Sequence, residues 1–194
     1  MCIRDRRKDA VLKVSGPLGE VNLQENVYAP ILDVLAPHQP RSIADIEAAC
    51  APQGLNIAQI TQAVFVLAGY GYVQAVQDEV AIAGARPQAE RLNRHLCQMA
   101  ITGTEVNFLA SPVTGGGTIV DRFGQLFLLA RQQGHTEPGD WVAYANEILL
   151  SQNQRLQKEG TPMAPDAQLA ELRRLADKFA EYTLPILQGL GIAA

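Results

Sequence analysis

LASPVTGGGTIVDRFGQLFLLA, which runs from Leu109 to Ala130, is the stretch that decides how the second half of this chain folds. Its first part, Leu109–Gly117, is a polar loop with three consecutive glycines. Its second part, Ile119–Ala130, repeats apolar residues at helical spacing. A glycine loop ahead of a helix predicts either an anion cradle at the helix N-terminus or a plain connector. Whether the chain has chemistry of its own depends on which of the two it is.

The residues around the glycines favour a connector. No lysine follows them, so the loop is not a P-loop, and it has no G-x-G-x-x-G between a strand and a helix. Asp121 and Arg122 could face a ligand at the helix start, but an aspartate in a first helical turn more often simply complements the helix dipole. We keep seven residues as candidate ligand or interface contacts: Asn107, Thr114, Gly115, Gly116, Gly117, Asp121 and Arg122.

The composition bounds the class of protein. The 194 residues are 47% hydrophobic but 6% aromatic, and the formal net charge is -4. The composition favours helices. A chain with a net negative charge does not attract nucleic acid or an anionic membrane. No apolar run reaches the length of about 18 residues that a membrane span needs, and no secretory signal is visible. We expect a cytoplasmic protein with neither nucleic-acid nor membrane partners.

Catalytic and metal-binding patterns are missing from the sequence. Cys2, Cys50 and Cys97 stand far apart with no C-x-x-C pair, which indicates a reducing compartment. His95 and Cys97 are two residues apart on a predicted helix, so they point to different sides. Ser111 precedes a proline and has no G-x-S-x-G context. We therefore assign no catalytic, cofactor-binding or metal-binding residue, although a small enzyme built around residues 111–118 stays an alternative.

The first part of the chain predicts a winged-helix-like module over residues 10–83. A short strand at 10–14 precedes three short helices, and capping-box patterns at Ser42 and Asn56 start the second and third. Residues 72–76 and 79–83 predict a hairpin. Residues 1–9 are treated as a leader, because residues 1–6 (MCIRDR) resemble a translated sequencing adaptor; a genuine start is the alternative.

The charge of this module argues against DNA binding. From Ser15 to Ala83 there are seven acids and one base, Arg41, so the segment carries -7 + 1 = -6. The would-be recognition helix, 57–68, has no lysine or arginine. Because duplex binding depends on neutralising phosphates, we expect this module to contact protein instead.

Residues 84–194 predict a helical region with one short strand, 104–110. We expect Pro87 to open a helix with Leu92, Leu96 and Met99 facing inward, and a further helix over 119–133. Helices over 136–156 and from Asp166 onward should pack as an antiparallel pair, with Pro185 kinking or ending the last one. The predicted fold class is mainly α with small β elements: a winged-helix-like module, then a helical region that ends in this pair.

A family resemblance is carried by the stretch from Ala85 to Ala130. Ala85–Pro87 and the helix after it, the run 104–107 (TEVN), and a Leu-rich helix around 127–129 resemble the methyltransferase regulatory domain. That domain follows the catalytic domain in certain bacterial class I S-adenosylmethionine-dependent methyltransferases. The resemblance is diffuse and covers about residues 10–133.

The resemblance implies a non-catalytic regulatory or substrate-recognition domain whose partner is a missing N-terminal methyltransferase domain. S-adenosylmethionine would be the cofactor of the parent protein. The cofactor loop in a βαβ setting is not found in this sequence, which fits a chain truncated before its catalytic domain. The alternative is a free-standing winged helix used for protein interaction or transcription regulation.

Overall fold

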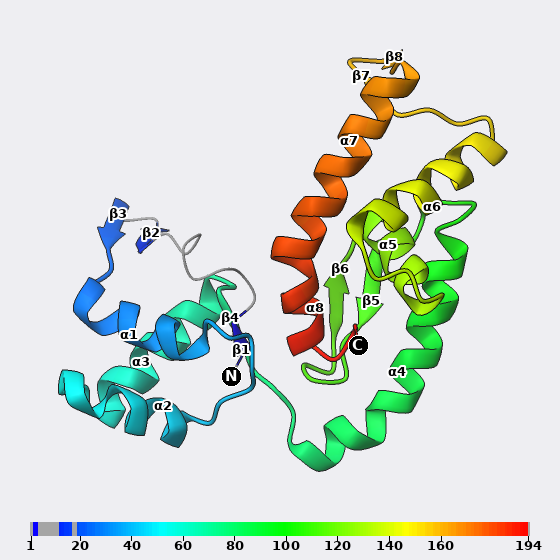
Figure 1. Cartoon of the computed structure of the whole chain (residues 1–194). Helices are drawn as coiled ribbons and strands as arrows, with labels where there is room; N and C mark the ends of the chain where they lie inside the picture. The colour runs from blue at the N-terminus through cyan, green and yellow to red at the C-terminus, as the bar shows by residue number, and fades with distance from the viewer. Residues whose placement is uncertain (1, 4–11, 17–18, 194) are drawn as a thin grey trace.

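The computed structural model describes residues 2–3, 12–16 and 19–193. This described part is mainly helical, with four antiparallel sheets of two strands each, so the prediction of a helical fold with small β elements is confirmed. Its buried apolar side chains form two separate clusters, one ending at Val73 and the other starting at Cys97. Figure 1 shows the two corresponding parts side by side, joined by a short segment ahead of α4.

The N-terminal part packs three helices around one apolar cluster. Its members include Ile31, Leu35, Ile46, Ile60 and Leu67, all fully buried. The elements in chain order are β1 (Cys2–Ile3), β2 (Lys13–Gly16), β3 (Gly19–Asn22), α1 (Glu25–Leu35), α2 (Ile43–Cys50), a 3-10 turn (Ala51–Gln53), α3 (Ile57–Gly69) and β4 (Val73–Gln74).

Two helix starts follow directly from local sequence. Ser42 and Asp45 form a capping box at α2, in which each side chain accepts a hydrogen bond from the other residue's backbone N–H. Asn56 and Gln59 do the same at α3, with both bonds 3.0 Å long. Both predicted capping boxes are therefore confirmed, because each depends only on residues three apart.

The predicted hairpin of 72–76 and 79–83 is wrong. Residues 79–83 form the first turns of α4, because the Asp78 carboxylate accepts a hydrogen bond of 2.8 Å from Ala81 N and so caps a helix there. β4 pairs instead with β1, antiparallel, with Val73 opposite Ile3. Of the expected leader, residues 1 and 4–9 lie outside the described residues, as do residues 10 and 11 of the predicted first strand.

The C-terminal part consists of five α-helices and two hairpins, β5–β6 and β7–β8, and it contains the second cluster. The aromatic centre of this cluster is Phe127, Trp141 and Phe179, whose ring centroids lie 5.5–6.1 Å apart. The elements are α4 (Glu79–Met99), β5 (Phe108–Ala110), β6 (Gly117–Ile119), α5 (Arg122–Gln132), α6 (Pro138–Ser151), β7 (Gln157–Lys158), β8 (Thr161–Pro162), α7 (Pro165–Lys178), a π-helical turn (Phe179–Thr183) and α8 (Leu184–Gly189).

α4 corrects two predictions at once. It begins at Glu79, so Pro87 lies in its interior and does not open it. Pro87 cannot bond the carbonyl of Ala83, but Ala83 is exposed and this carbonyl can bond water. The buried face is also different: Leu92 and Met99 are exposed. The buried side chains are Ala89, Asn93 and Cys97, at i, i+4 spacing, and Leu96 is partly buried against the cluster, as expected.

The predicted helix pair is present. α6 and α7 pack against each other and run in opposite directions in Figure 1. Gln168 of α7 donates to the Asn146 side chain of α6 at 2.8 Å and accepts from Leu156 N at 3.0 Å. Beyond α7 the chain makes a π-helical turn, and Pro185 stands in the first turn of α8. The helix does not end at Pro185, since α8 continues to Gly189; what changes just before this proline is the backbone geometry, from the π-helical turn to α8.

Candidate functional site

The glycine stretch is the turn of a β-hairpin and not a strand-to-helix joint. The expected strand 104–110 is confined to β5, and residues 117–119, expected to lead into the helix, form β6. β5 and β6 are antiparallel, with Leu109 opposite Thr118. Gly115 takes the left-handed conformation, φ +70°, that the turn requires. The helix predicted over 119–133 begins only at Arg122.

Ser111 organises the turn from inside. Its buried hydroxyl donates to the Leu190 carbonyl at 2.8 Å and accepts from Thr114 N at 3.1 Å. Its backbone N–H donates to Gly116 O, and its carbonyl accepts from Gly115 N. The amides of residues 111, 114 and 115 are thus used within the turn. The turn therefore offers few N–H groups to an anion, and Ser111 has no base as hydroxyl partner.

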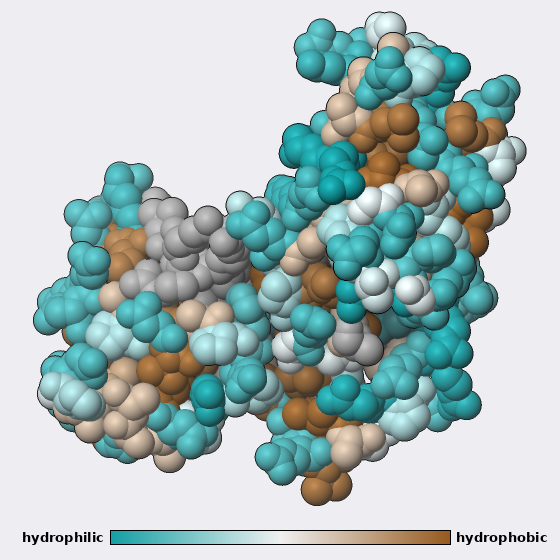
Figure 2. All heavy atoms as spheres, viewed as in Figure 1, coloured by the Kyte–Doolittle hydropathy of each residue, from teal (hydrophilic) through white to brown (hydrophobic). Residues whose placement is uncertain are grey.

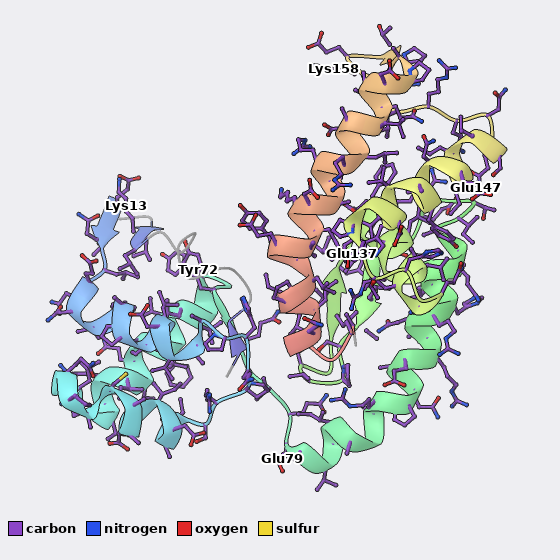
Figure 3. The ribbon with its side chains drawn as sticks, in the orientation of Figure 1. Lys13, Tyr72, Glu79, Glu137, Glu147 and Lys158 are labelled. Atoms are coloured by element: carbon purple, nitrogen blue, oxygen red, sulfur yellow. The ribbon has the colours of Figure 1, made fainter. Side chains whose placement is uncertain are left out.

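The outer side of the turn contacts the segment that joins the two parts of the chain. Gln77 N donates to Val113 O at 2.9 Å, and the Gln77 amide donates to Pro112 O at 3.4 Å. Gly115 lies so close to the Gln77 side chain that a Cβ at position 115 would overlap it. Figure 3 labels Glu79, just beyond this segment, at the N-terminal end of α4. The turn therefore joins the connecting segment, residues 75–78, to the C-terminal tail, residues 190–193.

The other candidate residues lie at the opposite end of the hairpin. The Asn107 carbonyl accepts from Val120 N at 2.9 Å, and Asp121 is the N-cap of α5, where it accepts from Gly124 N at 2.7 Å. Three strand residues, about 10 Å at 3.3 Å per residue, separate this end from the turn. The seven candidates therefore form two groups and not one site.

Arg122 is a structural clamp. Its guanidinium donates to the carbonyls of Ala100 and Ile101, each at 2.8 Å, and these residues follow the C-terminal end of α4. It also donates to the Gln154 and Gln152 side chains after α6, at 2.8 and 3.2 Å. Burial lowers the pKa of Arg122. The arginine uses its fork of donors on helix ends, so it has little capacity left for a ligand.

Asn93 is the residue that the sequence reading missed. It is 4% exposed, and its amide pairs with both backbone groups of one residue: Nδ2 donates to Ala110 O at 2.8 Å and Oδ1 accepts from Ala110 N at 2.7 Å. The side chain therefore replaces a neighbouring strand along β5. A polar residue midway between Ala89 and Cys97, at i, i+4 spacing, was the signal available in the sequence.

The described residues contain no cluster of three or more His, Cys, Asp or Glu side chains able to hold a metal ion. Burial raises the pKa of the Cys97 thiol to about 12, so this cysteine is not a nucleophile at neutral pH. Burial likewise raises the pKa of Cys50, with a smaller effect of Asp33.

The exposed side of α3 is uncharged. The thirty residues from Ala48 to Gln77 include no Asp, Glu, Lys or Arg. Phe65 is 73% exposed and Ile57 46%, and both line a shallow surface hollow with Thr61 and Gln62. Figure 2 shows apolar surface over the helices of this part of the chain. α3 thus presents uncharged apolar side chains to the solvent.

Comparisons with known proteins give one informative match. An uncharacterized protein of Synechocystis sp. is 31% identical over 187 residues, which is 96% of this chain and 36% of the relative. The chain therefore spans little more than a third of the length of the curated relative that it matches. No protein-family model matches the sequence, and no solved structure matches it. Among the described residues, no helix combines the length and apolar character needed to cross a membrane.

Proposed function

We propose that this chain is a non-catalytic regulatory or substrate-recognition domain of an S-adenosylmethionine-dependent methyltransferase. The observation that carries the proposal is the match to about a third of a longer protein, which leaves 64% (100 - 36) of the relative for a catalytic domain. The resemblance of residues 85–130 to the methyltransferase regulatory domain supplies the identity of that partner. S-adenosylmethionine would bind in the partner domain, and the location would be cytoplasmic.

The local chemistry supports a non-catalytic role. The glycine turn is occupied by its own hydrogen bonds, and Arg122 is committed to the ends of α4 and α6. The Ser111 hydroxyl bonds backbone groups, and Cys97 is buried. A domain of this kind would act through its surfaces, by covering the catalytic domain or by holding its substrate.

The test uses the Synechocystis relative in full length and a variant that lacks the segment matching this chain. Calorimetric titration with S-adenosylmethionine should show binding to both proteins and none to this chain alone. Binding of S-adenosylmethionine by this chain, or none by the full-length relative, would refute the assignment.

The α3 surface supports a second candidate function, a winged-helix-like protein-interaction module. α1, α2 and α3 share one core, as the helices of such a module do, and α3 presents uncharged Ile57 and Phe65. This candidate requires a protein partner but no methyltransferase. It would be favoured if the full-length relative bound no S-adenosylmethionine but lost a protein partner on Phe65→Ser substitution at the matching position.

A further inference from the structure

The outer edge of β6 is an unpaired strand edge. The Val120 N–H donates to Asn107 O, and the Ser111 N–H donates to Gly116 O. With the register of β5 and β6, the hydrogen-bonded residue pairs of the ladder are therefore 107–120, 109–118 and 111–116. The alternation of an antiparallel ladder then makes Phe108–Ile119 and Ala110–Gly117 the non-hydrogen-bonded pairs. Their backbone N–H and C=O groups point away from the hairpin, to its two outer edges.

The two outer edges differ in what covers them. On β5, α4 packs alongside and the Asn93 side chain pairs with both outward groups of Ala110. On β6, the outward groups of Gly117 and Ile119 have no hydrogen-bond partner among the described residues. Figure 1 shows β5 on the side of α4 and β6 on the side of α7 and α8. One edge is thus closed by a side chain that mimics a strand, and the other is open.

The open edge is also apolar. Leu109 faces the core, whereas Phe108 and Ile119 lie opposite each other on the outer face and are 54% and 59% exposed. Natural strand edges are usually protected by charged residues or proline. β2–β3 carries the Lys13–Glu20 ion pair, and β7–β8 contains Lys158 and a proline. Strands β5 and β6 contain neither a charged residue nor a proline.

A cavity continues this edge at the end of β6. It has a volume of about 220 Å³ and lies between Ile119, the start of α5 and the α7 segment; its apolar lining comes from Ile119, Phe123, Phe127, Leu175 and Phe179. This volume is below the range of about 300–1,000 Å³ typical of small-molecule sites and suits one large side chain. Val120, Gly124 and the polar residues Asp121, Lys178 and Thr183 complete its lining.

We propose that the β6 edge binds an extended segment of a partner polypeptide by strand addition, with one large apolar side chain of that segment in the adjacent cavity. The unpaired peptide groups of Gly117 and Ile119 specify a backbone as the ligand, because an extended chain supplies the complementary donors and acceptors in register. The volume and the apolar lining of the cavity favour a segment with one large apolar side chain at this position. This inference does not depend on the methyltransferase assignment, since it rests only on the hairpin and its neighbours.

The test is amide hydrogen exchange of the full chain, followed residue by residue by NMR. The probes are capped nine-residue peptides, Lys-Thr-Val-Thr-Xaa-Thr-Val-Thr-Lys, with Leu, Phe or Gly at Xaa. In the free chain the amides of Gly117 and Ile119 should exchange fast. At about 1 mM of the Leu or Phe probe, their exchange should slow by about fivefold or more, and the Gly probe should protect them less.

Two variants sharpen the test. Ile119→Lys puts a charge on the open edge and should abolish the protection, whereas Val21→Lys, at a 61% exposed position on the β3 strand, should leave it unchanged. Main-chain bonding is sequence-tolerant, so absence of protection with all probes would overturn the proposal, as would protection that survives Ile119→Lys. A free chain that sediments as a dimer, and as a monomer after Ile119→Lys, would assign the edge to a second copy and also overturn it.

Discussion

Gly189, the last residue of α8, lies directly against the backbone of His38, the residue that turns the chain away after α1. A Cβ at position 189 would overlap the His38 carbonyl oxygen. His38 is itself in the left-handed conformation, φ +58°, with its N–H bonded to Leu35 O at 3.1 Å. The contact joins the two parts of the chain beside the glycine turn, because the carbonyl of the adjacent Leu190 accepts from the Ser111 hydroxyl.

Gly189→Ala should therefore destabilise the protein. Because the clash is with backbone and not with a flexible side chain, we expect a loss of about 1–3 kcal/mol in the free energy of unfolding, measured by urea titration. Gly69→Ala is the matched control: Gly69 also ends a helix, and no atom lies within 4 Å of its Cβ position. Equal effects of the two substitutions would show that the close approach to His38 has no energetic consequence.

Substitution of Arg122 should lower stability and leave no specific binding defect. Arg122→Ala removes four hydrogen bonds and leaves the Ala100 carbonyl without a partner, whereas the Ile101 carbonyl keeps the bond of 2.6 Å from Gln152 Nε2. We therefore expect a loss of about 2–4 kcal/mol. Arg122→Lys should recover only part of this, because an ammonium cannot reach four acceptors with the geometry of the guanidinium fork. Thermal unfolding of both variants tests whether their stabilities fall in the order wild type, Arg122→Lys, Arg122→Ala. A lysine variant as stable as the wild type would contradict the clamp.

Asn93 should be needed for the hairpin. Asn93→Ala leaves the outward N–H and C=O of Ala110 unsatisfied, which should cost about 1–3 kcal/mol in unfolding free energy and speed amide exchange at Ala110. Gln98→Ala, an exposed polar position on the same helix, serves as control and should change stability by less than about 0.5 kcal/mol. Unchanged exchange at Ala110 in Asn93→Ala would count against this role.

The Cys97 thiol should make stability depend on alkaline pH. Its pKa is raised from an ordinary 9.0 to about 12 by burial, so between these values the unfolded chain has lost a proton that the folded chain retains. The folded state is then favoured less as pH rises, by up to about 1.4 kcal/mol per pH unit above 9. Urea titrations at increasing pH above 9 should show a steeper loss for the wild type than for Cys97→Ala. Parallel pH dependences would mean that the thiol ionises in the folded state.

The predictable features of the fold depend on short-range chemistry. The capping boxes at Ser42 and Asn56 could be predicted because each is complete within four residues. The helical character of the chain follows from periodicity over windows of similar length.

The features that the sequence did not reveal depend on distant partners. Asn93 is buried because its amide meets Ala110, and Arg122 turns inward because helix ends twenty or more residues away present carbonyls to it. Residues 79–83 alternate as a strand would, yet they are helical because Asp78 caps a helix there. The division of the candidate site into two groups required the register of β5 and β6, which neither strand specifies alone.

The central claim, an accessory role toward a methyltransferase domain, is tested most directly by co-expressing this chain with the part of the Synechocystis relative outside the match. Methyl transfer from labelled S-adenosylmethionine is then measured with and without this chain. We predict that the two co-purify and that this chain changes the rate of methyl transfer or the choice of acceptor. No association together with no change in methyl transfer would contradict the account.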